Sequence, residues 1–149
     1  MERSELEKLE TLFIFTPPPG STWDLTFTRL KELLLALDPE AFTRTEDPRD
    51  DLPGGGPFMF FEAALGDDDI EGMAKRDPEG VAVQNCTVPR AAEFVEWLRA
   101  SVVPQGGVIT FNTEWGLESG LPDALVPTAS EAELVDLFLT HIVQTGGLE

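Results

Sequence analysis

The stretch Val81–Trp115 constrains the fold more strongly than any other part of the chain. It begins with the alternating run VAVQNCT and continues through VPRAAEFVEWLRASVVP to QGG and VITFNTEW. Thr87 is a typical helix N-cap, Pro89 suits the first helical turn, and the apolar residues that follow recur with the period of a helix. Gly106 and Gly107 are typical of a helix end. The stretch therefore predicts a strand, a helix and a strand that form scaffold and core.

Similar patterns define the remaining elements. A helix capped by Ser21 or Thr22 is expected to run to about Leu37, with Trp23 on its apolar face. Residues 112–128 read as a long ordered loop with one short strand at most, and Ser130 with Glu133 forms a capping box for the last helix. Strands are predicted at 11–16, 41–45, 58–64, 70–75, 81–87 and 108–111, and helices at 22–37, 88–103 and 130–144.

This order of elements predicts the fold class. The helices are not interleaved with every strand, which favours an α+β fold over a parallel α/β fold. We expect one globular domain over residues 1–149, with a mixed or antiparallel sheet of about five to six strands and helices packed on one face. Such an arrangement is an elaborated ferredoxin-like sandwich.

The composition is that of a globular protein in a reducing compartment. Hydrophobic residues make up 42% of the chain and ten of its residues are Phe. The single cysteine, Cys86, cannot form an intramolecular disulfide, and its strand-like context predicts a small buried side chain. The charged start MERSELEKLE lacks the apolar segment of a signal peptide, and no apolar run reaches the ~20 residues of a membrane span. We therefore expect a cytoplasmic protein.

The net charge of −18 limits the choice of partners. Residues 40–79 hold twelve acidic and four basic residues, and no Lys or Arg follows Arg99. Such a field repels nucleic acids, anionic membranes and phosphorylated substrates, and it attracts basic proteins. Solubility alone is an equally good explanation of the charge.

Motifs for metal binding or catalysis are incomplete. Residues 67–72 match the first part of a calcium loop, but the position that needs a bidentate carboxylate is Pro78. The run Gly54–Gly56 lacks the lysine of a phosphate-binding loop, and the lone His141 cannot form a zinc site by itself. Glu114 beside Trp115 is the one hint of a glycosidase-like carboxylate site. We therefore expect a non-catalytic protein without a metal or cofactor, in which His141 is structural.

The acidic residues concentrate in three tracts that could contact a basic protein. The expected partner-binding residues are Glu46, Asp47, Asp50, Asp51, Asp67, Asp68, Asp69, Glu71, Glu114, Trp115 and Glu118. Loop-borne acids accelerate the capture of a basic partner, and nearby apolar side chains can serve as buried anchors. Two alternatives are a nucleic-acid mimic that occupies a DNA-binding protein, and a small-molecule-binding α+β domain.

In general character, the chain resembles the immunity proteins of bacterial polymorphic toxin systems. The resemblance rests on its small size, its single acidic α+β domain and its lack of a catalytic motif. The composition, rich in Ala, Gly, Pro, Asp and Glu and poor in Lys, resembles that of actinobacterial proteins. The resemblance implies a protein that neutralises a cognate toxin enzyme, often a basic one, by covering its active site. It assigns no role to any individual residue.

Overall fold

The described part of the chain folds around one seven-stranded antiparallel sheet. The structure, a computed structural model, describes residues 2–46, 57–76 and 79–145. The strands follow the order β2-β3-β4-β5-β1-β6-β7, and every described pair is antiparallel. The strands are β1 (Thr11–Thr16), β2 (Phe42–Glu46), β3 (Phe58–Leu65), β4 (Asp68–Arg76), β5 (Glu79–Cys86), β6 (Ile109–Thr113) and β7 (Ala124–Val126). The helices are α1 (Arg3–Leu6), α2 (Phe27–Leu37), α3 (Val88–Trp97), α4 (Glu114–Glu118) and α5 (Glu131–Gln144), and α3 continues into the π-helical turn Leu98–Val102.

The predicted α+β class is confirmed, with more strands than expected. The seventh strand, β7, is the one short strand that the sequence pattern allows within residues 112–128, whereas the short helix α4 in the same segment was not expected. The stretch Val81–Trp115 forms β5, α3 and β6, as predicted. Because β1 lies between β5 and β6, these elements make a split βαβ unit, which is the central feature of a ferredoxin-like sandwich.

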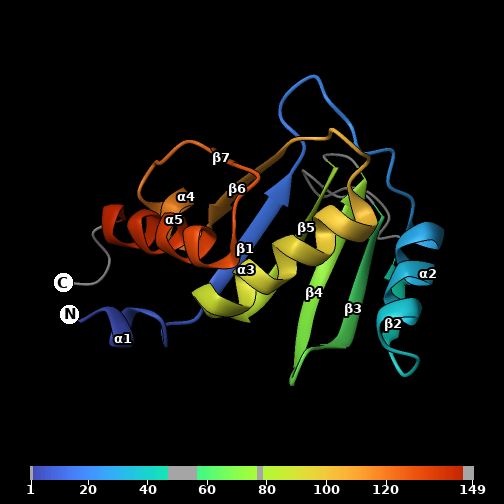
Figure 1. Cartoon of the computed structure of the whole chain (residues 1–149). Helices are drawn as coiled ribbons and strands as arrows, with labels where there is room; N and C mark the ends of the chain where they lie inside the picture. The colour runs from blue at the N-terminus through green and yellow to red at the C-terminus, as the bar shows by residue number, and fades with distance from the viewer. Residues whose placement is uncertain (1, 47–56, 77–78, 146–149) are drawn as a thin grey trace.

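The helices cover one face of the sheet. Figure 1 shows α3 and α5 in front of the strands, where alternate residues of β1 and β5 are buried. The ring of Phe13 lies 5.4 Å from that of Phe138 in α5, and the ring of Phe15 lies 5.8 Å from that of Phe94 in α3. Every second residue of these strands therefore points toward the helices and contributes to the core on that face.

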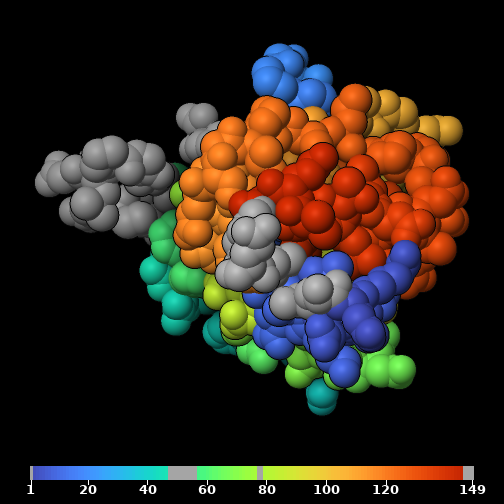
Figure 2. All heavy atoms as spheres, turned by 90° about the vertical axis from the view of Figure 1, so that its left-hand side faces the viewer, coloured from blue at the N-terminus to red at the C-terminus, as the bar shows by residue number. Residues whose placement is uncertain are grey.

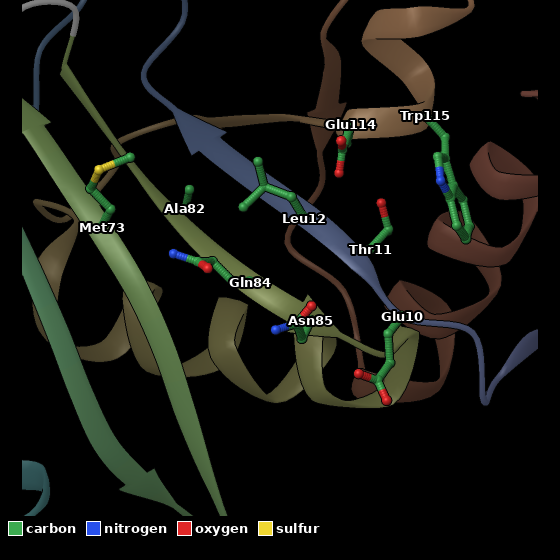
Figure 3. Close-up of a pocket in the computed structure, with 9 residues that line it drawn as sticks. All are labelled: Glu10, Thr11, Leu12, Met73, Ala82, Gln84, Asn85, Glu114 and Trp115. Carbon is green, nitrogen blue, oxygen red and sulfur yellow. The ribbon is translucent and has the colours of Figure 1, made fainter.

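The same alternation places a second set of side chains on the opposite face, which we call the open face. In Figure 3 the helix α3 lies behind the strands, so the open face of the sheet is turned toward the viewer. Its residues follow from the strand register. They include Leu12, Ile14, Phe42, Arg44, Glu46, Phe58, Phe60, Glu62, Ala64, Asp69, Glu71, Met73, Lys75 and Ala82.

The predicted start of the second helix is wrong. The helix α2 begins at Phe27, after an N-cap at Thr26 whose side chain accepts a hydrogen bond from the Arg29 amide. Trp23 therefore precedes the helix instead of lying on its apolar face. Glu79 accepts hydrogen bonds from the backbone amides of Trp23 and Leu25, at 2.8 and 2.9 Å, which holds this segment in a non-helical path.

The N-terminal segment packs beside the last helix. An ion pair joins Nη2 of Arg3 to Oδ1 of Asp136 at 2.7 Å, and Figure 2 shows the blue N-terminal segment that begins at residue 2 beside the residues of α5. Among the helices that the structure describes, none combines the length and the apolar character that a bilayer crossing requires.

Candidate functional site

The structure separates the predicted acidic tracts instead of joining them. Glu46 ends β2, pairs in register with Phe58 and forms a 2.9 Å ion pair with Arg44. Asp68 and the turn residue Asp67 lie at the other end of the sheet, beside Leu65. Asp47, Asp50 and Asp51 lie outside the described residues. Glu46 is therefore separated along the sheet from the acids of β4.

The acids of β4 lie on two faces because they belong to a strand. Asp68, Asp69 and Glu71 are exposed, and Ile70 between them is buried. A calcium loop needs consecutive ligands that converge on one point, which an extended strand cannot provide. No group of three or more His, Cys, Asp or Glu residues with metal-binding geometry occurs within residues 2–46, 57–76 and 79–145.

Two glutamates lie directly opposite each other on the open face. Glu62 of β3 and Glu71 of β4 are register partners, and both are exposed. Side chains at such positions have Cβ atoms about 5 Å apart, and like charges placed there destabilise a sheet. The structure gives neither carboxylate a cationic partner among the described residues. This pair marks an acidic end of the open face.

An exposed aromatic side chain borders this pair. Phe42 of the edge strand β2 pairs in register with Glu62, and its side chain is 55% exposed. Along the strand, Arg44 lies over the ring of Phe60 at 5.0 Å. Lys75 and Glu46 both lie beside Phe58, toward one end of the open face, and Arg44 lies at the level of Phe60 in its middle. Glu62, Glu71 and Asp69 lie toward the other end.

The helix α4 brings Glu114 and Trp115 to the border of the open face. Its N-cap is Thr113, whose buried Oγ1 accepts a hydrogen bond from the Gly116 amide at 2.9 Å. The same oxygen lies 3.0 Å from Nε2 of His141 in α5. His141 is 5% exposed, and burial lowers the pKa of its imidazole. As predicted from its position in the last helix, His141 is a buried side chain, here one that anchors α4.

A pocket of about 270 Å³ opens between α4 and the strands of the open face. Figure 3 shows the side chains that line it, with the carboxylate of Glu114 projecting from the start of α4 and the indole of Trp115 beside it. The lining residues are Glu10, Thr11, Leu12, Met73, Ala82, Gln84, Asn85, Glu114 and Trp115. Of the predicted partner-binding residues that the structure describes, only Glu114 and Trp115 line this pocket, and Glu118 is exposed on the same helix.

A β-bulge shapes the floor of the pocket. Thr11 pairs with Cys86 and Phe13 pairs with Val83, so β5 contributes one residue more than β1 between the two pairs. Asn85 accommodates the bulge with a positive φ of 47°, which asparagine tolerates better than most residues. The bulge brings the amide side chains of Gln84 and Asn85 into the lining.

The hydroxyl of Thr11 has no hydrogen-bond partner within the described part of the chain. Thr11 is 5% exposed, and its Oγ1 is buried. In Figure 3 this hydroxyl is directed toward α4, between Glu114 and Trp115. A buried hydroxyl without a partner costs about 1–3 kcal/mol, and such groups are rare in folded proteins.

Cys86 does not add a reactive thiol to these polar groups. The Cys86 thiol is buried, and this burial raises its pKa to about 12, so the thiol stays protonated and unreactive at neutral pH. The arrangement of carboxylates, amides, a hydroxyl and an indole can bind a cationic group.

The sequence pattern did not identify Glu10, Glu62 and Phe42 as surface residues at the acidic end of the open face. Glu62 is the single charge within the apolar run FMFFEAAL, and its solvent-facing position follows from strand alternation. Its neighbours Phe42 and Glu71 depend on strand pairing, which periodicity within one strand does not reveal.

Comparison of the chain with protein-family models, curated proteins and solved structures found no match.

Proposed function

We propose that this protein is a non-catalytic acidic binding protein that captures a basic protein partner through the acidic end of the open face. The observation that carries the proposal is the register pairing of Glu62 with Glu71 on a sheet face that no described helix covers. Two unpaired like charges at this spacing destabilise the free protein. A cationic partner would remove that cost on binding.

The surroundings of the pair provide the other parts of a protein interface. Phe42 and the indole of Trp115 are aromatic groups of the kind that serve as buried anchors. The apolar side chains of Met73 and Ile14 flank Ala82 on the same face. The net charge of −18 adds a long-range field that speeds encounter with a basic protein.

The finer proposal follows the resemblance to immunity proteins. We propose that the basic partner is a toxin enzyme and that the open face covers its active site. A sheet face of this kind can occupy a concave site without inserting a loop. Its acidic end would then oppose the basic residues of an enzyme that acts on a polyanion.

The test compares two pairs of charge-neutralising substitutions. The pair E62Q/E71Q removes two acids from the open face. The control pair E32Q/E96Q removes two exposed acids from α2 and α3, on the helical side, with the same change in net charge. Each tagged variant is used to capture the product of a neighbouring gene at about 0.05 M and about 0.5 M salt.

We expect the wild type and E32Q/E96Q to retain a basic partner at low salt, and E62Q/E71Q to lose it. Inhibition of the partner's enzymatic activity by the wild type would support the toxin assignment. Equal retention by all three proteins, or failure of the wild type to retain a basic protein at low salt, would contradict the proposal.

A further inference from the structure

We infer that the pocket between α4 and the open face receives a guanidinium group, contributed by an arginine side chain of the basic partner. The inference rests on the proposed function, because it names the group that the acidic end of the open face recognises. It differs from that proposal in assigning a defined pocket and a defined chemistry.

The unpartnered hydroxyl of Thr11 is the first observation in its favour. Buried polar atoms are nearly always hydrogen-bonded, and this Oγ1 is an exception at the wall of a pocket. Figure 3 shows it directed toward the space flanked by Glu114 and Trp115. A donor that enters this space would supply the missing hydrogen bond.

The remaining lining groups specify a cation. The carboxylates of Glu114 and Glu10 can accept hydrogen bonds, and the side-chain carbonyls of Gln84 and Asn85 add further acceptors. None of the nine lining residues is basic, so the described chain itself provides no counter-charge in the pocket. The site is therefore incomplete with respect to charge as well as hydrogen bonding.

The shape of the donor set favours guanidinium over ammonium. A guanidinium is planar and carries five N–H donors, so it can stack on the indole of Trp115 while it donates to both a carboxylate and a hydroxyl. An ammonium has three donors and a tightly held hydration shell, which it would have to lose in the pocket. Arginine is also enriched at the energetic centres of protein interfaces.

The experiment follows the indole N–H signal of Trp115 in the ¹⁵N-labelled full chain during titration with small probes. The signal is assigned with W115F. The probes are N-acetyl-arginine amide, N-acetyl-lysine amide and free arginine. We expect saturable shifts with the capped arginine, and binding of the capped lysine that is weaker by about fivefold or more.

Two variants locate the binding site and one serves as the control. E114Q removes the carboxylate at an exposed position, and T11V replaces the hydroxyl with a methyl group of similar size; we expect each to weaken binding of the capped arginine about threefold or more. E118Q changes an acid on the same helix that does not line the pocket, and we expect it to bind the probe as the wild type does. A thermal melt of each variant shows that it is folded.

Absence of a Trp115 shift, or equal shifts with arginine and lysine, would overturn the inference. So would equal weakening by E114Q and E118Q. Tighter binding of free arginine than of the capped probe would also overturn it, because the pocket would then serve a free amino acid. If the capped arginine does not bind specifically at the pocket but E62Q/E71Q still abolishes partner capture, the inference is wrong and the proposed function stands. Specific binding of the capped arginine without capture of a basic protein would remove the proposed function instead.

Discussion

The Nε2 atom of His141 lies 3.0 Å from the Oγ1 atom of Thr113, and both side chains are buried. The same oxygen accepts the Gly116 amide, so three elements, β6, α4 and α5, meet at one hydroxyl. The position of Glu114 and Trp115 at the pocket therefore depends on a neutral, buried imidazole.

This arrangement predicts a loss of stability in mild acid. Burial lowers the pKa of His141 in the folded protein below the value of about 6.5 for an exposed histidine. The unfolded chain therefore binds a proton more readily, and stability falls as the pH decreases from about 6.5 through the folded pKa. Urea unfolding midpoints between pH 5.5 and 8 test this. In H141Q, which carries no titrating group at this position, this pH dependence should be absent; an unchanged pH profile in H141Q would contradict the assignment.

A methyl group at Gly116 should disrupt the same junction. A Cβ atom there would contact Oδ1 of Asn112 and would lie 2.7 Å from Nε2 of His141. We expect G116A to lower the free energy of unfolding by about 1–3 kcal/mol, as overpacking of a core does. L117A, at the next and exposed position of α4, is the control and should change it by less than about 0.5 kcal/mol. Chemical denaturation measures both.

The carboxylate of Glu79 should be required for the segment that precedes α2. It accepts hydrogen bonds from the amides of Trp23 and Leu25 and from the hydroxyl of Thr22, at 2.7–2.9 Å. We expect E79Q to destabilise the fold by about 1.5–3 kcal/mol, since an amide can replace only part of this acceptor capacity. E40Q, at an exposed position, should have little effect. A Trp23 indole signal that is unchanged in E79Q would contradict this role.

The same contact explains which part of the fold the sequence predicts and which part it does not. The elements of the stretch Val81–Trp115 were predictable because their periodicity and caps are local. The start of α2 was not, because Trp23 fits a helical pattern and yet is held outside the helix by Glu79, more than fifty residues away in the chain. The short strand β7 is likewise defined by its pairing with β6 and not by its own sequence.

The like-charged pair on the open face should cost stability in the free protein. Either E62Q or E71Q alone removes the repulsion between the two carboxylates, so each should raise the free energy of unfolding by about 0.2–1 kcal/mol. The double variant should gain little beyond either single variant, because the repulsion is already absent. The free energies of unfolding of the wild type, E62Q, E71Q and the double variant form a double-mutant cycle. If the gains of the two single variants add in the double variant, the two carboxylates do not interact.

The candidate site could be predicted only in part, for a related reason. Glu114, Trp115 and Glu71 were expected from their acidic tracts, and the structure places them at one end of the open face or at its border. Glu46, expected from a different tract, lies toward the other end of the same face, beside Phe58. Strand order and register decide which acids share a surface, and neither can be read from the spacing of charges along the chain.

The most direct test of the central claim is the dissociation constant of the captured partner for three proteins, measured by calorimetry at one salt concentration. We predict that E62Q/E71Q weakens binding about tenfold or more relative to the wild type, which corresponds to about 1.4 kcal/mol, and that E32Q/E96Q weakens it less than about twofold. Equal weakening by the two pairs would show that only the total charge matters, and it would contradict a binding surface at the acidic end of the open face.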